Sequence, residues 1–245
     1  MSLDNVVVIL VGTKHPGNIG SAARALANMG VKRLVLAAPR CEVNEESQRL
    51  AKAGADVLAS AKAYPSLRAA VAGVGLLVGT TGKEGGYRAG AATPRALAPR
   101  ILAHAAGQDV GIVFGPEDTG LVDEDLRLCQ LLVRIPTDRD ARSLNLAQAV
   151  MIVAYELMLG SLAREPGRAL KLARVEQVEA MYAQLEAALL EIGFLQPQNA
   201  QHMMFALRKL LGRAGLESSD VGVLRGIARQ IGWCAKKQGR ASKNP

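Results

Sequence analysis

Short apolar runs alternate with helical patterns through the first 160 residues, and this alternation is the feature that most constrains the fold. The runs are nearly continuous in Val, Ile and Leu, as expected of parallel strands covered on both faces. The sequence therefore predicts an α/β domain on a mainly parallel sheet. The expected strands are Val6–Val11, Arg33–Ala37, Gly75–Gly79, Val110–Phe114 and Leu131–Ile135, and the expected helices are Ile19–Met29, Glu45–Ala53, Ser66–Ala72, Arg95–Ala105 and about Asn145–Leu162.

The pattern changes after the last of these helices. Residues 163–172 contain Pro and Gly among charged residues and are predicted to link a first domain, residues 1–162, to a helical segment, residues 173–245. That segment shows no strand pattern, and its apolar residues recur at three- and four-residue steps. The predicted helices run from Val175 to Ile192, from Asn199 with Met203, Leu207 and Leu210, and from Ser219 or Asp220 with Leu224, Ile227, Ile231 and Trp233.

The excess of positive charge lies mostly in the carboxy-terminal third of the chain. Residues 1–160 contain 17 basic and 15 acidic side chains, whereas residues 161–245 contain 13 basic and 7 acidic ones. A basic surface raises the affinity for a polyanion such as RNA without specifying its sequence. A solvated helical face would explain the charge equally well. Substrate capture and an extension for dimerisation or stability therefore both remain open.

Cysteine spacing and hydropathy argue against several classes of protein. Cys41, Cys129 and Cys234 are far apart and form no CxxC pair, which favours reduced thiols over a disulfide framework or a zinc site. We therefore predict no metal site. No apolar run approaches the roughly 20 residues that span a bilayer, and the first residues do not resemble a signal peptide. We expect a cytoplasmic protein that does not enter the membrane.

The loop after the first predicted strand contains the pattern Asn18-x-Gly20-x-x-x-Arg24. A Gly-rich loop before a helix can bind phosphate through backbone amides. Here, however, Asn18 and Ile19 stand where a P-loop needs Lys and Ser or Thr, and no GxGxxG follows the strand. Arg24 lies in an otherwise uncharged helical stretch, which predicts a partner for its charge.

Two further segments follow later strands. In residues 112–121 a strand ends at Gly115-Pro116, and Glu117 and Asp118 are then expected at the carboxyl edge of the sheet, where α/β proteins bind ligands. In residues 135–157 a polar loop leads to Ser143-Leu144-Asn145 and an almost wholly apolar helix. Helix capping alone would explain Ser143 and Asn145, and Asn145 with Gln148 resembles a capping box.

In this order and at these separations, the three segments resemble the motifs of the SPOUT RNA methyltransferases, in the branch that modifies ribose 2′-hydroxyls. The signature NxGxxxR matches Asn18, Gly20 and Arg24, FGPExxGL matches residues 114–121, and SLN matches residues 143–145. The resemblance covers about residues 5–160. With the basic helical segment, the chain is similar to bacterial members that methylate the ribose of nucleotide 32 in the tRNA anticodon loop. Another tRNA position, or rRNA, stays open as the target.

The resemblance implies a trefoil knot in the carboxy-terminal part of the α/β domain, S-adenosylmethionine as cofactor, tRNA as partner and a homodimer. It assigns activation of the ribose hydroxyl to Arg24, reaching the cofactor of the partner chain, with Asn18 and Ser143 orienting and Glu117 securing the loops or offsetting the sulfonium charge. A guanidinium stays protonated at neutral pH. Arg24 is therefore better suited to bind the adjacent phosphate and stabilise an oxyanion than to act as a base. The cofactor site implied by the family comprises Thr80, Thr81, Gly82, Gly115, Ile135, Arg142, Ser143, Leu144 and Asn145.

Two other classes of function compete with this interpretation. A non-catalytic RNA-binding protein on the same scaffold would keep the basic helices but would not need intact cofactor loops, and all three loops are intact here. An α/β enzyme that uses another nucleotide is disfavoured by the failed P-loop and dinucleotide patterns.

Overall fold

The computed structural model describes residues 3–83, 85, 88, 90–141, 143–163, 172–213 and 215–241. The chain forms two compact units, residues 1–171 and residues 172–245. The predicted cofactor residue Arg142 and most of the predicted linker, residues 163–172, lie outside the described residues. Within the described ranges, every helix is too short or too polar to cross a bilayer.

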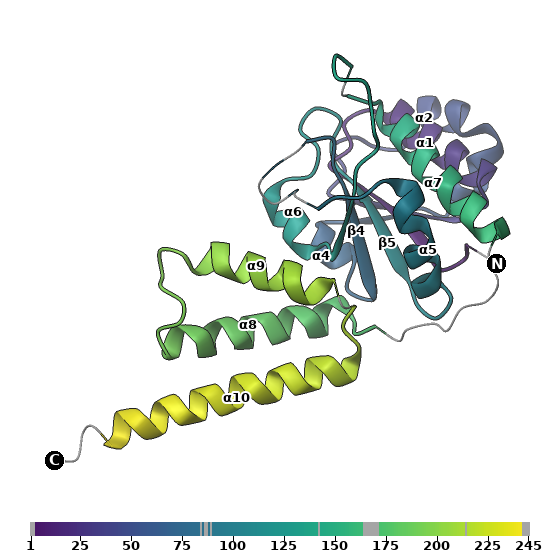
Figure 1. Cartoon of the computed structure of the whole chain (residues 1–245). Helices are drawn as coiled ribbons and strands as arrows, with labels where there is room; N and C mark the ends of the chain where they lie inside the picture. The colour runs from purple at the N-terminus through teal and green to yellow at the C-terminus, as the bar shows by residue number, and fades with distance from the viewer. Residues whose placement is uncertain are drawn as a thin grey trace. The chain divides into compact units, whose positions relative to one another are not determined.

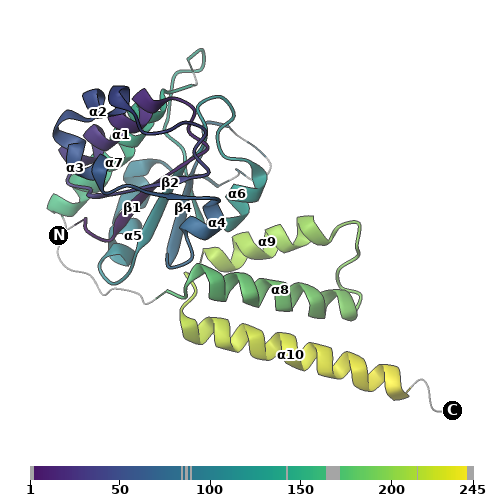
Figure 2. The same cartoon turned by 180° about the vertical axis from the view of Figure 1, so that it is seen from behind.

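The first unit contains a sheet of six strands in the order β3-β2-β1-β5-β4-β6. Figures 1 and 2 label β1, β2, β4 and β5 of this sheet. Every neighbouring pair is parallel, which confirms the predicted α/β class. β1 is buried along its whole length, as a strand covered on both faces must be. The strands are β1 Val6–Val11, β2 Arg33–Ala37, β3 Lys62–Tyr64, β4 Leu76–Thr80, β5 Val110–Phe114 and β6 Leu131–Val133.

The helices of this unit pack around the sheet (Figure 2). α7 contacts both α1 and α5, while α2 and α3 pack against α1, and α4 and α6 contact strands. Their bounds are α1 Pro16–Asn28, α2 Glu45–Ala51, η1 Lys52–Gly54, α3 Ala55–Ala59, α4 Leu67–Ala70, α5 Pro94–Ala105, α6 Asp123–Leu128 and α7 Leu146–Ala163.

Several short elements differ from the sequence prediction, among them α3, which lies beyond the helix expected at Glu45–Ala53. β3 was not predicted because its three residues are only partly covered and lie at the sheet edge. α6 was missed because its six residues begin with three acids, a pattern that also fits a solvated turn. β6 was predicted to reach Ile135 but ends at Val133, since the Arg134 amide donates to the carbonyl of Ala92 in the loop that returns from β4.

α1 packs against its neighbours backbone to backbone. A Cβ added to Gly20 would lie 2.1 Å from the carbonyl oxygen of Ser47 in α2, and one added to Gly54 would lie 2.4 Å from backbone atoms of Ala23. Such distances leave no room for a side chain. The glycine of the first motif is therefore explained by helix packing, which fixes the start of α1 beside the end of β1.

The second unit consists of α8 Val175–Glu191, α9 Ala200–Gly212 and α10 Ser218–Ala241, close to the three predicted helices. Met181, Tyr182 and Met204 are among its buried core. Arg208 forms an ion pair with Glu179, and its guanidinium lies 4.3 Å from the centre of the Tyr182 ring.

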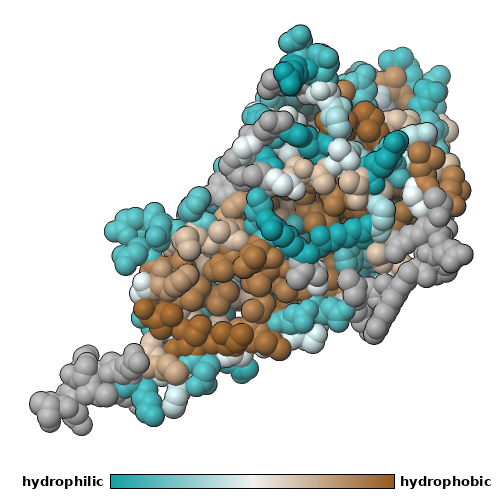
Figure 3. Space-filling view, in the orientation of Figure 1, coloured by the Kyte–Doolittle hydropathy of each residue, from teal (hydrophilic) through white to brown (hydrophobic). Residues whose placement is uncertain are grey.

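The prediction that the apolar residues of the second unit face its core was partly wrong. Leu210, Ile227 and Trp233 are 62%, 49% and 57% exposed rather than packed in the core. The reason is that α8 lies between the other two helices in its contacts, so in the described part of this unit α9 and α10 each pack chiefly on α8 and keep an apolar face that is not covered. Figure 3 shows the resulting apolar surface on this unit.

Candidate active site

The loops after β1 and β5 leave the sheet side by side. Leu10 and Phe114 are register partners near the ends of these two adjacent strands. From β1 the chain continues to β2 on one side, whereas from β5 it continues to β6 on the other side. Such a reversal opens space between two loops, and ligands of open α/β sheets bind at this point. The first and second motifs are these two loops.

Asn18, Glu117 and Asn145 form a row of hydrogen bonds that joins all three motifs. The side-chain nitrogen of Asn18 donates to Oε1 of Glu117 at 2.7 Å. The side-chain nitrogen of Asn145 donates to Oδ1 of Asn18 at 2.9 Å. The structure therefore brings together segments that are about a hundred residues apart in the sequence.

The direction of these hydrogen bonds is set by the start of α7. Oδ1 of Asn145 accepts from the amide of Ala147 at 2.9 Å, so Asn145 caps the helix. The amide of Asn145 donates to Gln148 at 3.1 Å, which is one of the two hydrogen bonds of the predicted capping box. With its oxygen used, Asn145 turns its nitrogen toward Asn18. Asn18 must then accept on its oxygen and donate from its nitrogen, and that donor requires an acceptor at Glu117.

Glu117 is held as a carboxylate. Burial favours the neutral form, but hydrogen bonds from Asn18 and from the backbone amides of Glu117, Lys14 and His15 outweigh it, so the pKa of Glu117 is lowered. The amide of Lys14 donates to Oε2 at 3.2 Å. The Lys14 ammonium itself pairs with Asp118 at 2.7 Å, at a more exposed position. A negative charge is thus maintained between the loops after β1 and β5.

The loop that carries Glu117 is tightly folded. A Cβ on Gly115 would lie 2.2 Å from the amide nitrogen of Leu121, so the loop closes directly on its own first residue. The amide of Gly120, at φ +68°, donates to the carbonyl of Pro116 at 2.9 Å. This closure needs glycine at both positions and gives Glu117 a defined place.

The predicted cofactor residues follow three strands that are neighbours in the sheet, because β4 lies between β5 and β6. The Thr80 hydroxyl donates to the carbonyl of Val113 at 2.9 Å, and the Thr81 amide donates to Val133 at 2.9 Å. Both threonines therefore tie adjacent loops together. Gly115 and Ile135 are half-buried at the ends of the neighbouring strands, and Gly82 is exposed.

These residues fit S-adenosylmethionine by their chemistry. The predicted residues at the three strand ends are uncharged, and all of them except Gly82 are partly buried, as suits an adenosine bound through backbone groups and apolar contacts. The Glu117 carboxylate follows Gly115 by two residues. A carboxylate is the kind of group that complements the positive charge of a sulfonium.

Arg24 and Ser143 stand apart from this hydrogen-bonded row. Arg24 is exposed and forms no hydrogen bond or ion pair with any described residue, so the partner expected for its charge is not found among these residues. It follows Asn18 by six residues, about 9 Å along the helix axis and on a different face. Ser143 is also exposed, while Leu144 is half-buried beside it.

Two contributors were not predicted. The backbone amide of Lys14 binds Glu117, and no sequence signal marks a backbone donor. Arg88, in the loop after β4, pairs with Asp123 at 3.2 Å and donates to the carbonyl of Leu121 at 3.3 Å. Arg88 thereby joins the loop after β4 to the loop after β5. In the sequence, the glycines around Arg88 indicate a loop but not this contact.

Comparisons with known proteins cover both units. The sequence model of the SpoU rRNA Methylase family matches residues 5–155, and that of the tRNA methyltransferase TrmJ C-terminal domain matches residues 176–243. The chain is 37% identical over 239 residues to the tRNA (cytidine/uridine/adenosine-2′-O-)-methyltransferase TrmJ of Pseudomonas aeruginosa, covering 92% of this chain and 93% of that protein. It is 36% identical to the tRNA (cytidine/uridine-2′-O-)-methyltransferase TrmJ of Photorhabdus laumondii, covering 96% of this chain and all of that protein.

A solved structure is similar over nearly the same length. The crystal structure of TrmJ from Z. mobilis ZM4 superposes with a TM-score of 0.78 at 33% sequence identity, covering 92% of this chain and 98% of that chain. The similarity therefore extends over both units of the fold.

Proposed function

Because the chain belongs to the SpoU rRNA Methylase family, we propose that it transfers the methyl group of S-adenosylmethionine to a ribose 2′-hydroxyl of tRNA. The membership confirms the resemblance inferred from the three sequence motifs. The observation that carries the proposal is the row Asn145–Asn18–Glu117, which joins all three motifs where the sheet reverses direction. By analogy with the subfamily, we take the target to be a cytidine or uridine at position 32 of the anticodon loop.

The alternatives explain less of the chain. A non-catalytic RNA-binding protein has no use for a row of side-chain amides that ends on a partly buried carboxylate. Relatives similar over both units are named tRNA 2′-O-methyltransferases, which favours tRNA over rRNA as the substrate.

When bound, S-adenosylmethionine supplies an electrophilic methyl carbon. The residues proposed to hold it are Thr80, Thr81, Gly82, Gly115, Ile135, Arg142, Ser143, Leu144 and Asn145. The principal contribution of the protein is alignment of the ribose oxygen behind that carbon, and such positioning is worth several kcal/mol of the barrier. Glu117, kept ionised by its hydrogen bonds, offsets the positive charge of the donor.

Arg24 is proposed to stabilise the ribose oxygen as its proton leaves. A guanidinium remains protonated at neutral pH, so it binds the adjacent phosphate and the developing oxyanion rather than removing a proton. The proton passes to water or to another group. Asn18 and Ser143 orient the reacting groups, and Asn18 has its own orientation set by Asn145.

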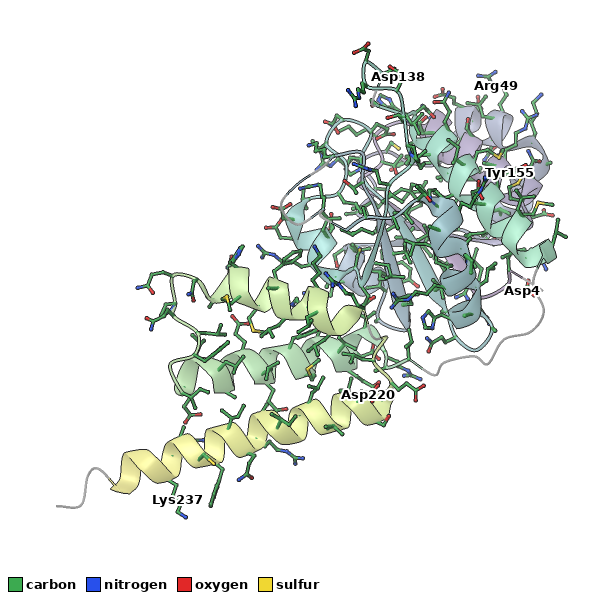
Figure 4. All side chains as sticks on the ribbon, in the orientation of Figure 1. Asp4, Arg49, Asp138, Tyr155, Asp220 and Lys237 are labelled. Carbon is green, nitrogen blue, oxygen red and sulfur yellow. The ribbon has the colours of Figure 1, made fainter. Side chains whose placement is uncertain are left out.

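The position of Arg24 supports a homodimer with shared sites. α7 is apolar almost all round, yet one of its faces leaves Tyr155 at 46% and Leu159 at 38% exposed. Figure 4 labels Tyr155 on the outer side of this helix. A helix that is apolar on all faces is normally buried. We take a second copy of the chain to cover this face and to bring its Arg24 to the Asn18–Glu117 site.

The family also implies a trefoil knot in the chain between β4 and α7. The loop returning from β4 lies beside the chain that leaves β6, since Ala92 bonds to both Leu132 and Arg134. This adjacency supports the proposal that the end of the domain passes through a preceding loop.

The second unit, which has ten basic and six acidic side chains in residues 172–245, is proposed to capture tRNA in the cytoplasm, as a domain linked to the catalytic unit by residues 163–172. Its net charge and its match to the C-terminal domain of TrmJ support this role. Removing residues 165–245 should weaken tRNA binding more than cofactor binding, and equal tRNA affinity after truncation would contradict it.

The central experiment measures cofactor binding and methyl transfer on the full chain. Calorimetry should detect binding of S-adenosylhomocysteine, and a radiolabelled donor should mark tRNA at a ribose. Arg24→Ala should keep cofactor binding and lose transfer. A folded wild-type sample that binds no S-adenosylhomocysteine would remove the proposed function.

A further inference from the structure

The one tryptophan of the chain, Trp233, lines an open groove between α8 and α10. The groove has a volume of about 360 Å³. Trp233 is 57% exposed, although burying an aromatic ring of this size is strongly favourable. An exposed ring beside a groove offers a flat face on which another planar group can stack.

The floor of the groove is built from small residues. Ala187 and Ala188 line it from α8, and Ala228 and Gly232 line it from α10. A Cβ at Gly232 would lie 3.2 Å from Oε2 of Glu191, so the two helices are close at this point. Small side chains and the glycine leave the space beside the tryptophan free of bulky groups.

The rim of the groove is basic. Arg229 and Lys236 lie one turn before and one turn after Trp233, and neither forms an ion pair within the described parts of the chain. The Lys237 ammonium lies 5.1 Å from the centre of the tryptophan ring, and Figure 4 labels this lysine on α10. α10 carries five basic residues and one acid in its sequence: Arg225, Arg229, Lys236, Lys237, Arg240 and Asp220.

Glu191 is the acidic member of the groove lining. Its carboxylate would repel a phosphate placed beside it, so the phosphates of a ligand belong on the rim. A carboxylate accepts hydrogen bonds, however, and the exocyclic amine of cytosine is a suitable donor. The groove thus combines a stacking ring, an acceptor for an amine and cations for phosphates, which are the features that recognise an unpaired nucleotide.

We propose that an unpaired cytidine of the tRNA stacks on Trp233 in this groove, with its flanking phosphates on Arg229 and Lys236 and its amine on Glu191. The proposal deepens the proposed function and rests on it, because the ligand is the tRNA substrate. It assigns to the second unit a base contact in addition to charge attraction.

Intrinsic fluorescence of the full-length protein tests the proposal directly, because Trp233 is its only tryptophan. Tetracytidylate should quench the emission and should bind several-fold more tightly than tetrauridylate. Inorganic polyphosphate, which has charge but no bases, should leave the emission unchanged. Glu191→Gln should remove the preference for cytidine while the quenching remains. Equal quenching by polyphosphate, or none by either oligonucleotide, would overturn the proposal.

Variants test the same contact on whole tRNA. Trp233→Ala should raise the Kd about tenfold, the size expected for loss of one stacked base, whereas Trp233→Phe should keep most of the affinity. Val223→Ala is the matched control, because Val223 is 63% exposed on the same helix and lies outside the groove. Its Kd should not change.

The outcomes separate this inference from the proposed function. If the wild type methylates tRNA and Trp233→Ala binds it as tightly, the inference fails and the proposed function stands. If the wild type transfers no methyl group to tRNA while tetracytidylate quenches Trp233, the proposed function fails and the nucleotide groove stands. A blue shift of the emission that grows with protein concentration, without RNA, would assign the groove to a second copy of the chain and overturn the proposal.

Discussion

The side-chain amide of Asn145 donates to Oδ1 of Asn18 at 2.9 Å, across 127 positions of the sequence. The same amide group caps α7 through the backbone of Ala147. One residue therefore both starts α7 and sets the direction of the hydrogen bonds that reach Glu117. The capping function and the site function of Asn145 can be separated by substitution.

Asn145→Asp should fold normally but lose methyl transfer. Aspartate caps a helix as well as asparagine does, so the melting temperature should stay close to that of the wild type. It has no donor for Asn18, whose amide would turn and direct its oxygen at the Glu117 carboxylate. The value of kcat should fall at least tenfold, measured with radiolabelled donor and tRNA.

Asn145→Ala is the matched control for that variant. It removes the cap as well and should cost about 1 kcal/mol of stability in addition to the activity. Wild-type turnover by Asn145→Asp would show that the direction of the hydrogen bonds is irrelevant to the reaction.

Gly20→Ala should destabilise the first unit although alanine is the better helix former. The new Cβ would lie 2.1 Å from the Ser47 carbonyl oxygen, so α1 and α2 must move apart, at a cost of about 2 to 3 kcal/mol. Urea unfolding measures this loss. Gly73→Ala is the control, because a Cβ there meets nothing within 4 Å and should change the stability by less than about 0.5 kcal/mol. Similar effects at both positions would contradict the packing role of Gly20.

The charge of Glu117 should make part of the stability depend on pH. Its pKa in the folded protein is lowered, so the carboxylate contributes stability above the ordinary value of about 4.3, and this is lost as pH falls through the folded pKa. Glu117→Gln lacks the contribution at every pH. The two proteins should therefore differ most at pH 7 and converge in acid, as followed by urea unfolding. A difference that widens as the pH falls would mean that the pKa is raised instead.

Much of the fold follows from local sequence patterns. Five strands were predicted within two residues at each end because apolar runs buried on both faces have a strong signature. β3 and α6 lack that signature, since β3 is short and partly exposed and α6 opens with acids. The exposed positions of Ile227 and Trp233 were mispredicted for a different reason. Periodicity marks an apolar face, but it does not show whether a neighbouring helix covers it.

The arrangement of the site could be predicted less well from local sequence patterns. Each motif alone suits a cap or a turn, and Asn145 is indeed a cap. Only the parallel strand order brings the loops after β1 and β5 together, and strand order depends on long-range pairing. Contacts made by a backbone amide, such as that of Lys14 with Glu117, leave no mark in the sequence.

Mixing two inactive variants should restore activity if each site is shared between two copies. In the proposed dimer, Arg24 of one copy serves the Asn18–Glu117–Asn145 row of the other. A heterodimer of Arg24→Ala with Asn145→Asp then has one site in which both damaged residues meet and one site in which all residues are native. Random exchange of subunits makes half of the dimers mixed, so activity should rise to about a quarter of the wild-type value. Leu159→Glu on the exposed face of α7 should block the recovery by preventing dimerisation, which sedimentation can confirm. If the mixture stays inactive although subunits exchange, Arg24 acts within its own chain.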